Sequence, residues 1–216
     1  MIISLSEFDP TTFSFHDDPV LVVENFWNAE ERSRFRKAME QSTWTALAEM
    51  PPVAAAFKDC GNWLKSEIGP EEGNYFMSRV GLSCIAEYVE SFPNIKSRHI
   101  NFNYYSYGVG DCLSTHDDTD EAYAYAEGKT PPTRRLALAT YFHERWESDW
   151  GGELIIYREK PDFQETHQLE VVQCIPPMPG SLAVFSVPRH HRVCRVDPLA
   201  GNHTRLSIAG WFMTAS

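Results

Sequence analysis

Residues 179–196, PGSLAVFSVPRHHRVCRV, hold two short apolar runs separated by a proline, an arginine and two histidines. Runs of β-branched and aromatic residues bounded by glycine and proline are typical of short strands. Five similar runs occur in the same half of the chain: HINFNYYSY, RRLALATYF, GELIIY, LEVVQCI and TRLSIAGWF. About seven short strands in one half of a chain predict a sandwich or jelly roll.

The first 95 residues have a different texture. A buried strand is predicted for VLVVE at 20–24, and Asn28 with Glu31 forms a capping box that predicts a helix over 29–41. Two more helices are expected at about 53–67 and 79–90, ended by Gly69-Pro70 and by Pro93.

These patterns predict an α+β protein that is mainly β. A helix-rich support region, 1–95, precedes a jelly-roll core, 96–216, and the two form a single domain over 1–216, with the helices packed on one sheet.

Composition limits the function. The chain carries 19 Lys and Arg against 30 Asp and Glu, a formal net charge of −11, which argues against a nucleic-acid partner. No apolar run approaches the ~20 residues that cross a bilayer, so no membrane association is expected. Five scattered cysteines without a Cys-x-x-Cys pair indicate reduced thiols and a cytoplasmic location.

An acidic stretch, LSTHDDTDE at 113–121, contains the first candidate metal ligands. On an extended strand, His116 and Asp118 share one face while Asp117 points away. Downstream, His190 or His191 stands at the start of another strand. Two imidazoles and one carboxylate form the facial triad that holds non-haem Fe(II) and leaves positions open for a co-substrate and dioxygen.

A candidate carboxylate clamp follows in NHTRLSIAGWF. Arg205 and Ser207 are two residues apart on a predicted strand, so they share a face. A guanidinium matches a carboxylate with two parallel hydrogen bonds, and a serine hydroxyl can add another.

The order of these motifs resembles the Fe(II)/2-oxoglutarate-dependent dioxygenase superfamily, and within it the prolyl-hydroxylase-like branch, over about residues 99–213. The resemblance is carried by five elements: His116-x-Asp118, Gly-Gly-Glu-Leu at 151–154, Gly-Ser-Leu-Ala-Val-Phe at 180–185, His191-x-Val193, and Arg205-x-Ser207 with Trp211-Phe212.

The resemblance implies a double-stranded β-helix, a form of jelly roll, with iron on His116, Asp118 and His191. His191 is chosen because it alone starts the His-x-Val pattern, with His190 as the alternative. The resemblance also implies that Arg205 binds the distal carboxylate of 2-oxoglutarate, and that Ser207, Tyr141 and Tyr107 are further residues of the co-substrate site.

The implied activity is that of an oxidoreductase that hydroxylates a C–H bond of a free amino acid, a small metabolite or a prolyl-type residue, with release of succinate and CO2. Relatives that halogenate replace the carboxylate ligand by a small residue, so Asp118 favours hydroxylation. Two alternatives remain: a non-catalytic jelly-roll binding module, and a cupin-type dioxygenase that does not use 2-oxoglutarate.

Other residues have more than one interpretation. The segment 119–133, TDEAYAYAEGKTPPT, is a surface loop or a mobile flap over the site. Trp146, Trp150 and Trp211 either line a substrate pocket or lie in the core, and the core is expected. The pair Arg134 and Arg135 either meets an anionic group of the substrate or is simply exposed at the start of a strand, and exposure is expected.

Overall fold

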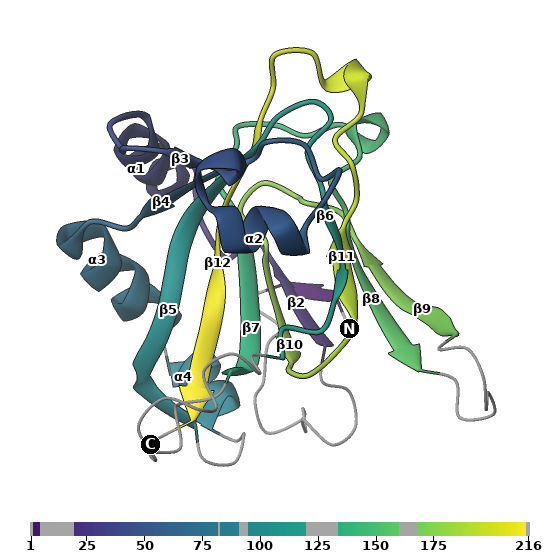
Figure 1. The fold of residues 1–216 in the computed structure, drawn as a ribbon. Helices are drawn as coiled ribbons and strands as arrows, with labels where there is room; N and C mark the ends of the chain where they lie inside the picture. Colours follow the sequence, from purple (N-terminus) through teal and green to yellow (C-terminus); the bar gives the residue numbers. More distant parts are fainter. Residues whose placement is uncertain are drawn as a thin grey trace.

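Two β-sheets of unequal size make up most of the molecule (Figure 1). The computed structural model describes residues 2–4, 20–81, 83–90, 95–119, 134–159 and 168–214. The eight-stranded sheet has the spatial order β1 (Ile2–Ser4), β2 (Val20–Glu24), β10 (Leu182–Ser186), β7 (Arg134–Tyr141), β12 (Arg205–Thr214), β5 (Ile95–Tyr107), β4 (Leu64–Glu67) and β3 (Thr45–Ala46). The four-stranded sheet has the order β6 (Leu113–His116), β11 (His191–Val193), β8 (Leu154–Glu159) and β9 (Leu169–Ile175). All pairings but β1 with β2 are antiparallel, and the fold is of the jelly-roll type that the sequence predicts.

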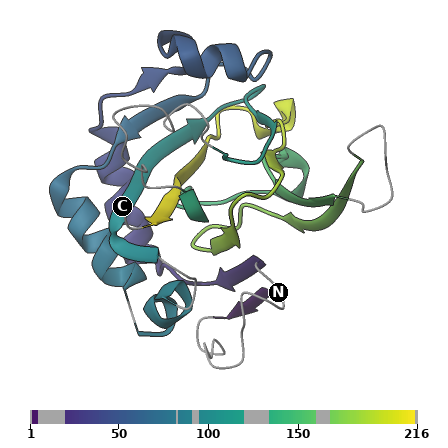
Figure 2. The ribbon, with the colours of Figure 1, turned by 60° about the horizontal axis from the view of Figure 1, so that its bottom comes forward.

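The helices and short 3-10 turns lie mainly in the first half of the chain. They are α1 (Ala29–Glu40), η3 (Leu47–Glu49), α2 (Pro51–Ala56), α3 (Pro70–Val80), α4 (Ser83–Glu90), η5 (Ser148–Trp150) and η6 (Pro198–Ala200). Figure 2 shows α1, α3 and α4 along one side of the large sheet, and α2 lies at a different edge of the molecule.

The strand predictions and the helix at 29–41 are confirmed, but the other two helices are partly wrong. The predicted helix 53–67 ends at Ala56, and residues 64–67 form β4 because they pair with β5. The predicted helix 79–90 is interrupted, because residues 79–80 end α3 and residues 83–90 form α4. Pro70, expected to end a helix, instead begins α3, since the first helical position needs no backbone N–H donor.

The helices cover one face of the large sheet with a continuous apolar core. Trp27 lies at its centre, with its ring against Phe35, Phe76 and Phe142 at centroid distances of 5.3, 5.8 and 5.4 Å. The indole N–H donates to the Thr140 hydroxyl at 2.8 Å, so the one polar atom of this side chain is satisfied inside the core. The expectation that helices pack on one sheet is confirmed.

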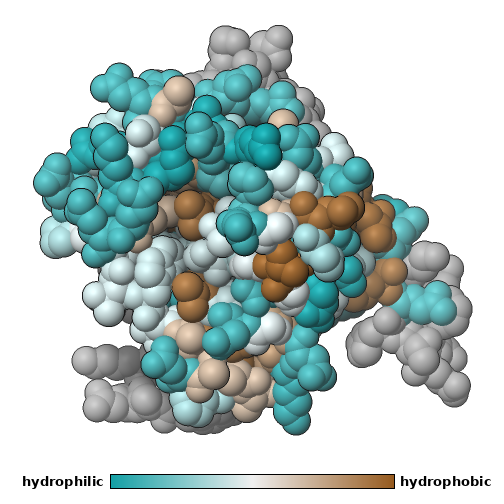
Figure 3. Space-filling model, turned by 90° about the horizontal axis from the view of Figure 1, so that it is seen from above, coloured by the Kyte–Doolittle hydropathy of each residue, from teal (hydrophilic) through white to brown (hydrophobic). Residues whose placement is uncertain are grey.

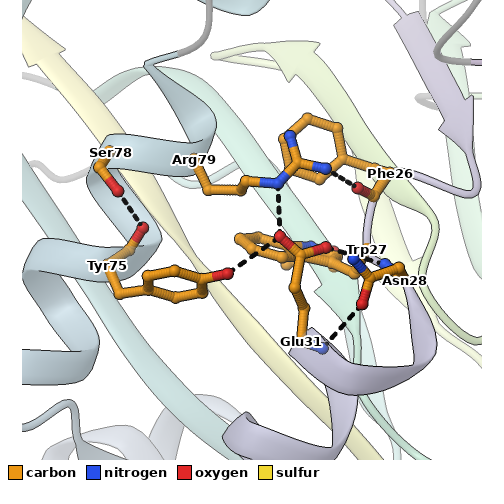
Figure 4. A network of polar contacts seen from close by, with 8 residues as sticks. Phe26, Trp27, Asn28, Glu31, Tyr75, Ser78 and Arg79 are labelled. Carbon is orange, nitrogen blue, oxygen red and sulfur yellow. Dashed lines mark hydrogen bonds and ion pairs between the residues drawn. The ribbon is translucent and has the colours of Figure 1, made fainter.

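A polar network joins α1 to α3 beside this core (Figure 4). Asn28 and Glu31 form the predicted capping box at the start of α1. Glu31 also accepts hydrogen bonds from the Tyr75 hydroxyl at 3.0 Å and from Arg79 Nε at 2.6 Å. Arg79 in turn donates to the Phe26 carbonyl at 2.7 Å, so both helices are tied to the end of β2.

The surface seen from the top of Figure 1 is mainly hydrophilic, with apolar residues in small separate groups (Figure 3). None of the helices in the described ranges is long and apolar enough to cross a bilayer. The candidate site lies inside the molecule, on the face of the large sheet opposite α1, α3 and α4.

Candidate active site

A cavity of about 500 Å³ lies between the two sheets, on the face of the large sheet opposite Trp27. Its lining includes His116 and His191 from the small sheet and Arg205 and Ser207 from β12. The cavity therefore contains the two motifs that the sequence analysis predicted separately, the metal triad and the carboxylate clamp.

The two histidines face each other across neighbouring strands. β6 and β11 are antiparallel, and His116 is the direct partner of His191 in their register. The imidazole centroids are 4.2 Å apart. This pairing explains how two residues far apart in sequence reach one point.

Asp118 completes a group of three possible metal ligands. Its Oδ1 lies 3.3 Å from His116 Nε2 and its Oδ2 lies 3.4 Å from His191 Nε2, and all three ligand atoms are within 4.8 Å of one another. His191 and Asp118 are buried, and His116 is half-buried. A divalent cation placed among these atoms could be reached by all three.

The strand periodicity that predicted this convergence is not what produces it. β6 ends at His116, and Asp118 adopts φ +63°, in the left-handed region that non-glycine residues seldom occupy. The turn brings the carboxylate back beside His116. Asp117 does not join the three ligand candidates, because its Oδ1 accepts the Thr119 backbone N–H at 2.9 Å.

Both imidazoles are oriented by the backbone. His116 Nδ1 lies 2.7 Å from the Ser114 carbonyl oxygen, and His191 Nδ1 lies 2.8 Å from the Arg189 carbonyl oxygen. A carbonyl can only accept, so each Nδ1 carries a proton, and in the tautomer that binds a metal each Nε2 presents its lone pair toward Asp118. Lone pairs facing a carboxylate repel unless a cation lies between them, which is the donor set that a divalent metal requires.

The protonation states agree with metal ligation. Burial alone would raise the pKa of Asp118, but the neighbouring His116 and His191 and the Trp211 N–H lower this pKa to about 2. Burial and the neighbouring His116 lower the pKa of His191 to about 4. Near neutral pH the carboxylate is charged and His191 is neutral, as ligands to a divalent ion must be.

Arg205 forms the other end of the site. It is 2% exposed, and its Nε donates to the Gly152 carbonyl at 2.8 Å. Its two terminal nitrogens make only long contacts, 3.4 Å to Ser207 Oγ and 3.3 Å to the Tyr141 hydroxyl. Within the described ranges no carboxylate pairs with this guanidinium. A buried, unpaired cation whose donors face a cavity is suited to an anionic ligand.

The Gly-Gly pair of the 151–154 motif has a structural reason. Gly152 has φ +74°, and a Cβ there would lie 3.0 Å from Arg205 Cδ. Gly151, at φ +68°, would place a Cβ against the Arg195 carbonyl. The two glycines therefore let this loop approach Arg205, so that the Gly152 carbonyl accepts a hydrogen bond from Arg205 Nε.

The two tyrosines predicted to bind the co-substrate lie on either side of Arg205. The Tyr141 ring is 4.7 Å from the guanidinium carbon and its hydroxyl accepts from Arg205. The Tyr107 ring is 5.4 Å from the same carbon and stacks on Trp63 at 5.7 Å. Burial raises the pKa of both phenols, so both stay neutral. Tyr141 contacts the clamp with a hydroxyl, and Tyr107 contacts it with a ring face.

Two further residues line the site, although another location was expected for each. Trp211, expected in the core, lines the cavity and donates from Nε1 to Asp118 Oδ2 at 2.7 Å. Arg134, expected to be simply exposed, lies 3.8 Å from the Trp211 ring centre and 3.9 Å from Asp118 Oδ1. Trp211 could have been found from its spacing, since 205, 207 and 211 share one face of a strand.

The remaining candidates fall outside the group. His190 Nδ1 lies 3.5 Å from Glu159 Oε1 and takes no part in the cluster with Asp118, which agrees with the choice of His191. Trp150 is buried in a smaller apolar cluster, and Trp146 packs against it. The segment 119–133 lies outside the described residues except for Thr119, so its prediction as loop or flap is not tested.

Jelly-roll sheets around a two-histidine, one-carboxylate cluster with a buried arginine define the class of metal- and 2-oxo-acid-dependent oxygenases. Residues 102–213 match the family model of the 2OG-Fe(II) oxygenase superfamily, and the chain belongs to this superfamily. It is therefore an enzyme that uses Fe(II) and 2-oxoglutarate. The family match therefore favours the 2-oxoglutarate-dependent oxygenase over the two alternatives, a non-catalytic binding module and a dioxygenase that does not use 2-oxoglutarate.

Solved structures with the same fold include three prolyl hydroxylases. The prolyl hydroxylase from Trichoplax adhaerens, in complex with a hypoxia inducible factor oxygen degradation domain peptide fragment, has 19% identity and a TM-score of 0.65, over 97% of this chain and 89% of that chain. The Pseudomonas putida prolyl-4-hydroxylase has 16% identity and a TM-score of 0.62, over 94% and 96%. The viral collagen prolyl hydroxylase from Paramecium Bursaria Chlorella virus-1, a 2OG complex, has 15% identity and a TM-score of 0.57, over 94% and 100%. No curated protein sequence matches the chain significantly.

Proposed function

We propose that this protein is a hydroxylase in which one domain, residues 1–216, oxidises a C–H bond of an amino acid, a small metabolite or a prolyl-type residue. In this proposal His116, Asp118 and His191 hold Fe(II). Arg205, assisted by Ser207 and Tyr141, binds the distal carboxylate of 2-oxoglutarate, while the Tyr107 ring supports the guanidinium from the side. Succinate and CO2 are the co-products.

One observation carries the assignment of roles. Two Nε2 lone pairs converge on a carboxylate in the same cavity that holds a buried guanidinium without a carboxylate partner among the described residues. A divalent cation would bind the two imidazoles and the carboxylate, and a dianionic co-substrate would bind the guanidinium. Neither ligand alone accounts for both.

Bound Fe(II), together with 2-oxoglutarate and dioxygen, supplies the oxidant that removes hydrogen from the substrate. The chain contributes placement. Trp211 fixes the orientation of the Asp118 carboxylate, and the Gly152 carbonyl fixes the Arg205 fork. Apolar cavity residues, among them Leu154, Phe185 and Val193, limit the access of water.

The carboxylate ligand also bears on the reaction outcome. In this proposal Asp118 is the third ligand: one carboxylate oxygen faces His116, and the other faces His191 and accepts the Trp211 N–H. A halide would need that space, so hydroxylation is favoured over halogenation. Prolyl-type residues are one substrate class to test, because the similar structures are prolyl hydroxylases.

The test is reconstitution without oxygen followed by turnover. We expect the purified protein to bind about one Fe(II) per chain and to convert 2-oxoglutarate to succinate, faster when a panel of free amino acids or short proline-containing peptides includes a substrate. Tight iron binding with no succinate under any condition would contradict the proposal. Succinate formation that continues unchanged in an Arg205→Ala protein would contradict the assigned clamp.

A further inference from the structure

The charge of the cavity is opposite to that of the chain. The protein has a net charge of −11, yet the charged side chains that line the cavity are three cations, Lys65, Arg134 and Arg205, and two carboxylates, Asp117 and Asp118. A site with this inverted balance concentrates anions against the overall field of the protein.

Four of these five charged groups are engaged by other groups of the chain or by the proposed co-substrate. Asp118 and Asp117 have the partners described above, and Arg205 is the clamp. Arg134 donates to the Asp118 carbonyl at 3.5 Å and lies over Trp211. Lys65 is different, because no hydrogen bond or ion pair joins its side-chain ammonium to any residue in the described ranges.

The sheet register places Lys65 on the cavity face. Lys65 on β4 pairs with Tyr105 on β5, which pairs with Ser207 on β12, which pairs with Tyr141 on β7. Directly paired residues of neighbouring strands point to the same face. Because neighbouring strands are about 4.8 Å apart, the Cα atoms of Lys65 and Ser207, two strands apart, are separated by about 10 Å. It shares the clamp's face but stands at the far edge of the cavity, away from the proposed co-substrate.

An apolar wall lines the same cavity as Lys65. Met50, Val53 and Phe57, from α2 and its two flanking residues, belong to one apolar cluster with Trp63. The Trp63 ring lies 5.8 Å from the ring of Tyr105, the residue that pairs with Lys65. The Phe57 ring meets the His116 ring edge-on at 5.2 Å. The apolar wall thus extends from Trp63, two residues before Lys65, to the metal cluster at His116. A half-buried ammonium against such a wall gains most from a ligand that carries its own negative charge.

We propose that the substrate carries a carboxylate that binds Lys65, while its apolar part lies along the wall of Met50, Val53 and Phe57 with the reacting C–H bond toward His116. This rests on the proposed function and names its substrate class, a carboxylic acid. The carboxylate belongs either to a free amino acid or similar small acid, or to an acidic side chain of a peptide.

Binding measurements separate these sources without turnover. Protein loaded with redox-inert Zn(II) and 2-oxoglutarate is titrated calorimetrically with matched pairs: free amino acids against their amides, and proline-containing peptides with Asp against the same peptides with Asn. We expect one series of acids to bind about 10- to 100-fold more tightly than its neutral partners. The series that shows the difference identifies the source of the carboxylate.

Variants then assign the effect to one side chain. Lys65→Met should remove the preference for acids, Lys65→Arg should keep most of it, and Lys65→Glu should reverse it. Lys37→Met removes a lysine from the exposed face of α1, outside the cavity, and should change nothing. The affinity for 2-oxoglutarate should be the same in all four proteins, because Arg205 binds it.

Three results would overturn the proposal: acids and amides that bind equally to the unaltered protein, a preference that survives Lys65→Met, or a Lys65→Met defect confined to 2-oxoglutarate. The proposed function fails separately. A protein that prefers acids through Lys65 but never forms succinate would retain the carboxylate site and lose the hydroxylase assignment, whereas substrate-stimulated succinate without any acid preference would do the reverse.

Discussion

The two faces of the large sheet have the same backbone and opposite chemistry. On the helix side, Tyr104, Thr140 and Ile208 are buried in or against a closed apolar core. Their chain neighbours Tyr141 and Ser207 lie on the opposite face and contact the buried Arg205 guanidinium, and Ser207 lines the cavity between the sheets. Alternation along a strand therefore separates stability from function by a single residue.

The difference between the faces is also energetic. The helix face gains free energy from apolar burial, with Trp27 as its centre. The cavity face buries Arg205 and places two histidine lone pairs against Asp118, arrangements that cost free energy until ligands bind. The helix face thus stabilises the fold, whereas the cavity face lowers its stability. Substitutions on the helix face should therefore change mainly the free energy of unfolding, and substitutions on the cavity face mainly ligand binding and activity.

The largest effect is expected at the metal end. Asp118→Ala removes the only charged ligand candidate of the cluster and should lower succinate formation at least about 1000-fold. The control is Asp117→Ala, next to it, which should keep both iron binding and turnover because that carboxylate lies outside the three-residue cluster and accepts the Thr119 N–H. Iron content by elemental analysis and succinate by chromatography are measured for both. Equal iron content in the two variants would contradict the ligand assignment.

The next effect contrasts the two faces of β12. Arg205→Ala should raise the KM for 2-oxoglutarate about 100-fold or more, with activity partly recovered at high 2-oxoglutarate. Without ligand, its free energy of unfolding should be unchanged or higher, because the variant no longer buries an unpaired cation. Kinetics and urea unfolding of the metal-free protein check both parts.

Ile208→Ala, three residues along, is the matched control. Ile208 is fully buried in the helix-side core, and its truncation should lower the free energy of unfolding by about 2–5 kcal/mol. The KM for 2-oxoglutarate should not change. If Ile208→Ala changes the KM as strongly as Arg205→Ala, the two faces are not separable.

The different roles of the two sheet faces could partly be predicted from the sequence. Period-2 patterns predicted the strands, and the order of the motifs predicted that His116, Asp118 and His191 share one site. The structure places their ligand atoms within 4.8 Å of one another, and their role as iron ligands stays a prediction. The left-handed turn at Asp118 has no signature in a period-2 pattern. Likewise, Pro70 fits either end of a helix, and only the pairing of β4 with β5 decides that 64–67 is a strand.

A smaller effect compares two neighbours on β7. Thr140→Val removes a buried hydroxyl that accepts from Trp27 and donates to the Ser181 carbonyl at 2.6 Å, so unfolding should become easier by about 1–3 kcal/mol. Activity below the melting range should be unchanged. Tyr141→Phe removes a hydroxyl on the other face and should raise the KM for 2-oxoglutarate a few-fold, about 1 kcal/mol, with no loss of stability. Denaturation and kinetics together check the pair.

The last contrast lies just past the end of β7, where the alternation stops. Burial lowers the pKa of His143 to about 3 from an ordinary 6.5, although the hydrogen bond to the Pro177 carbonyl opposes this. Between pH 6.5 and 3 the unfolded chain binds a proton at His143 that the folded chain does not. Stability should therefore fall as pH falls through this window, by up to about 1.4 kcal/mol per pH unit from this group.

His143→Gln keeps a donor for the Pro177 carbonyl but does not titrate. The variant should lose that part of the pH slope between pH 6 and 4, whatever its stability at pH 7. Urea unfolding of the metal-free proteins at half-unit pH steps gives both slopes. His191, whose pKa is lowered to about 4, contributes to the slope in both proteins and cancels from the difference. An unchanged slope would mean that His143 is protonated or hydrated in the folded state, and that the dry core does not extend past the end of β7.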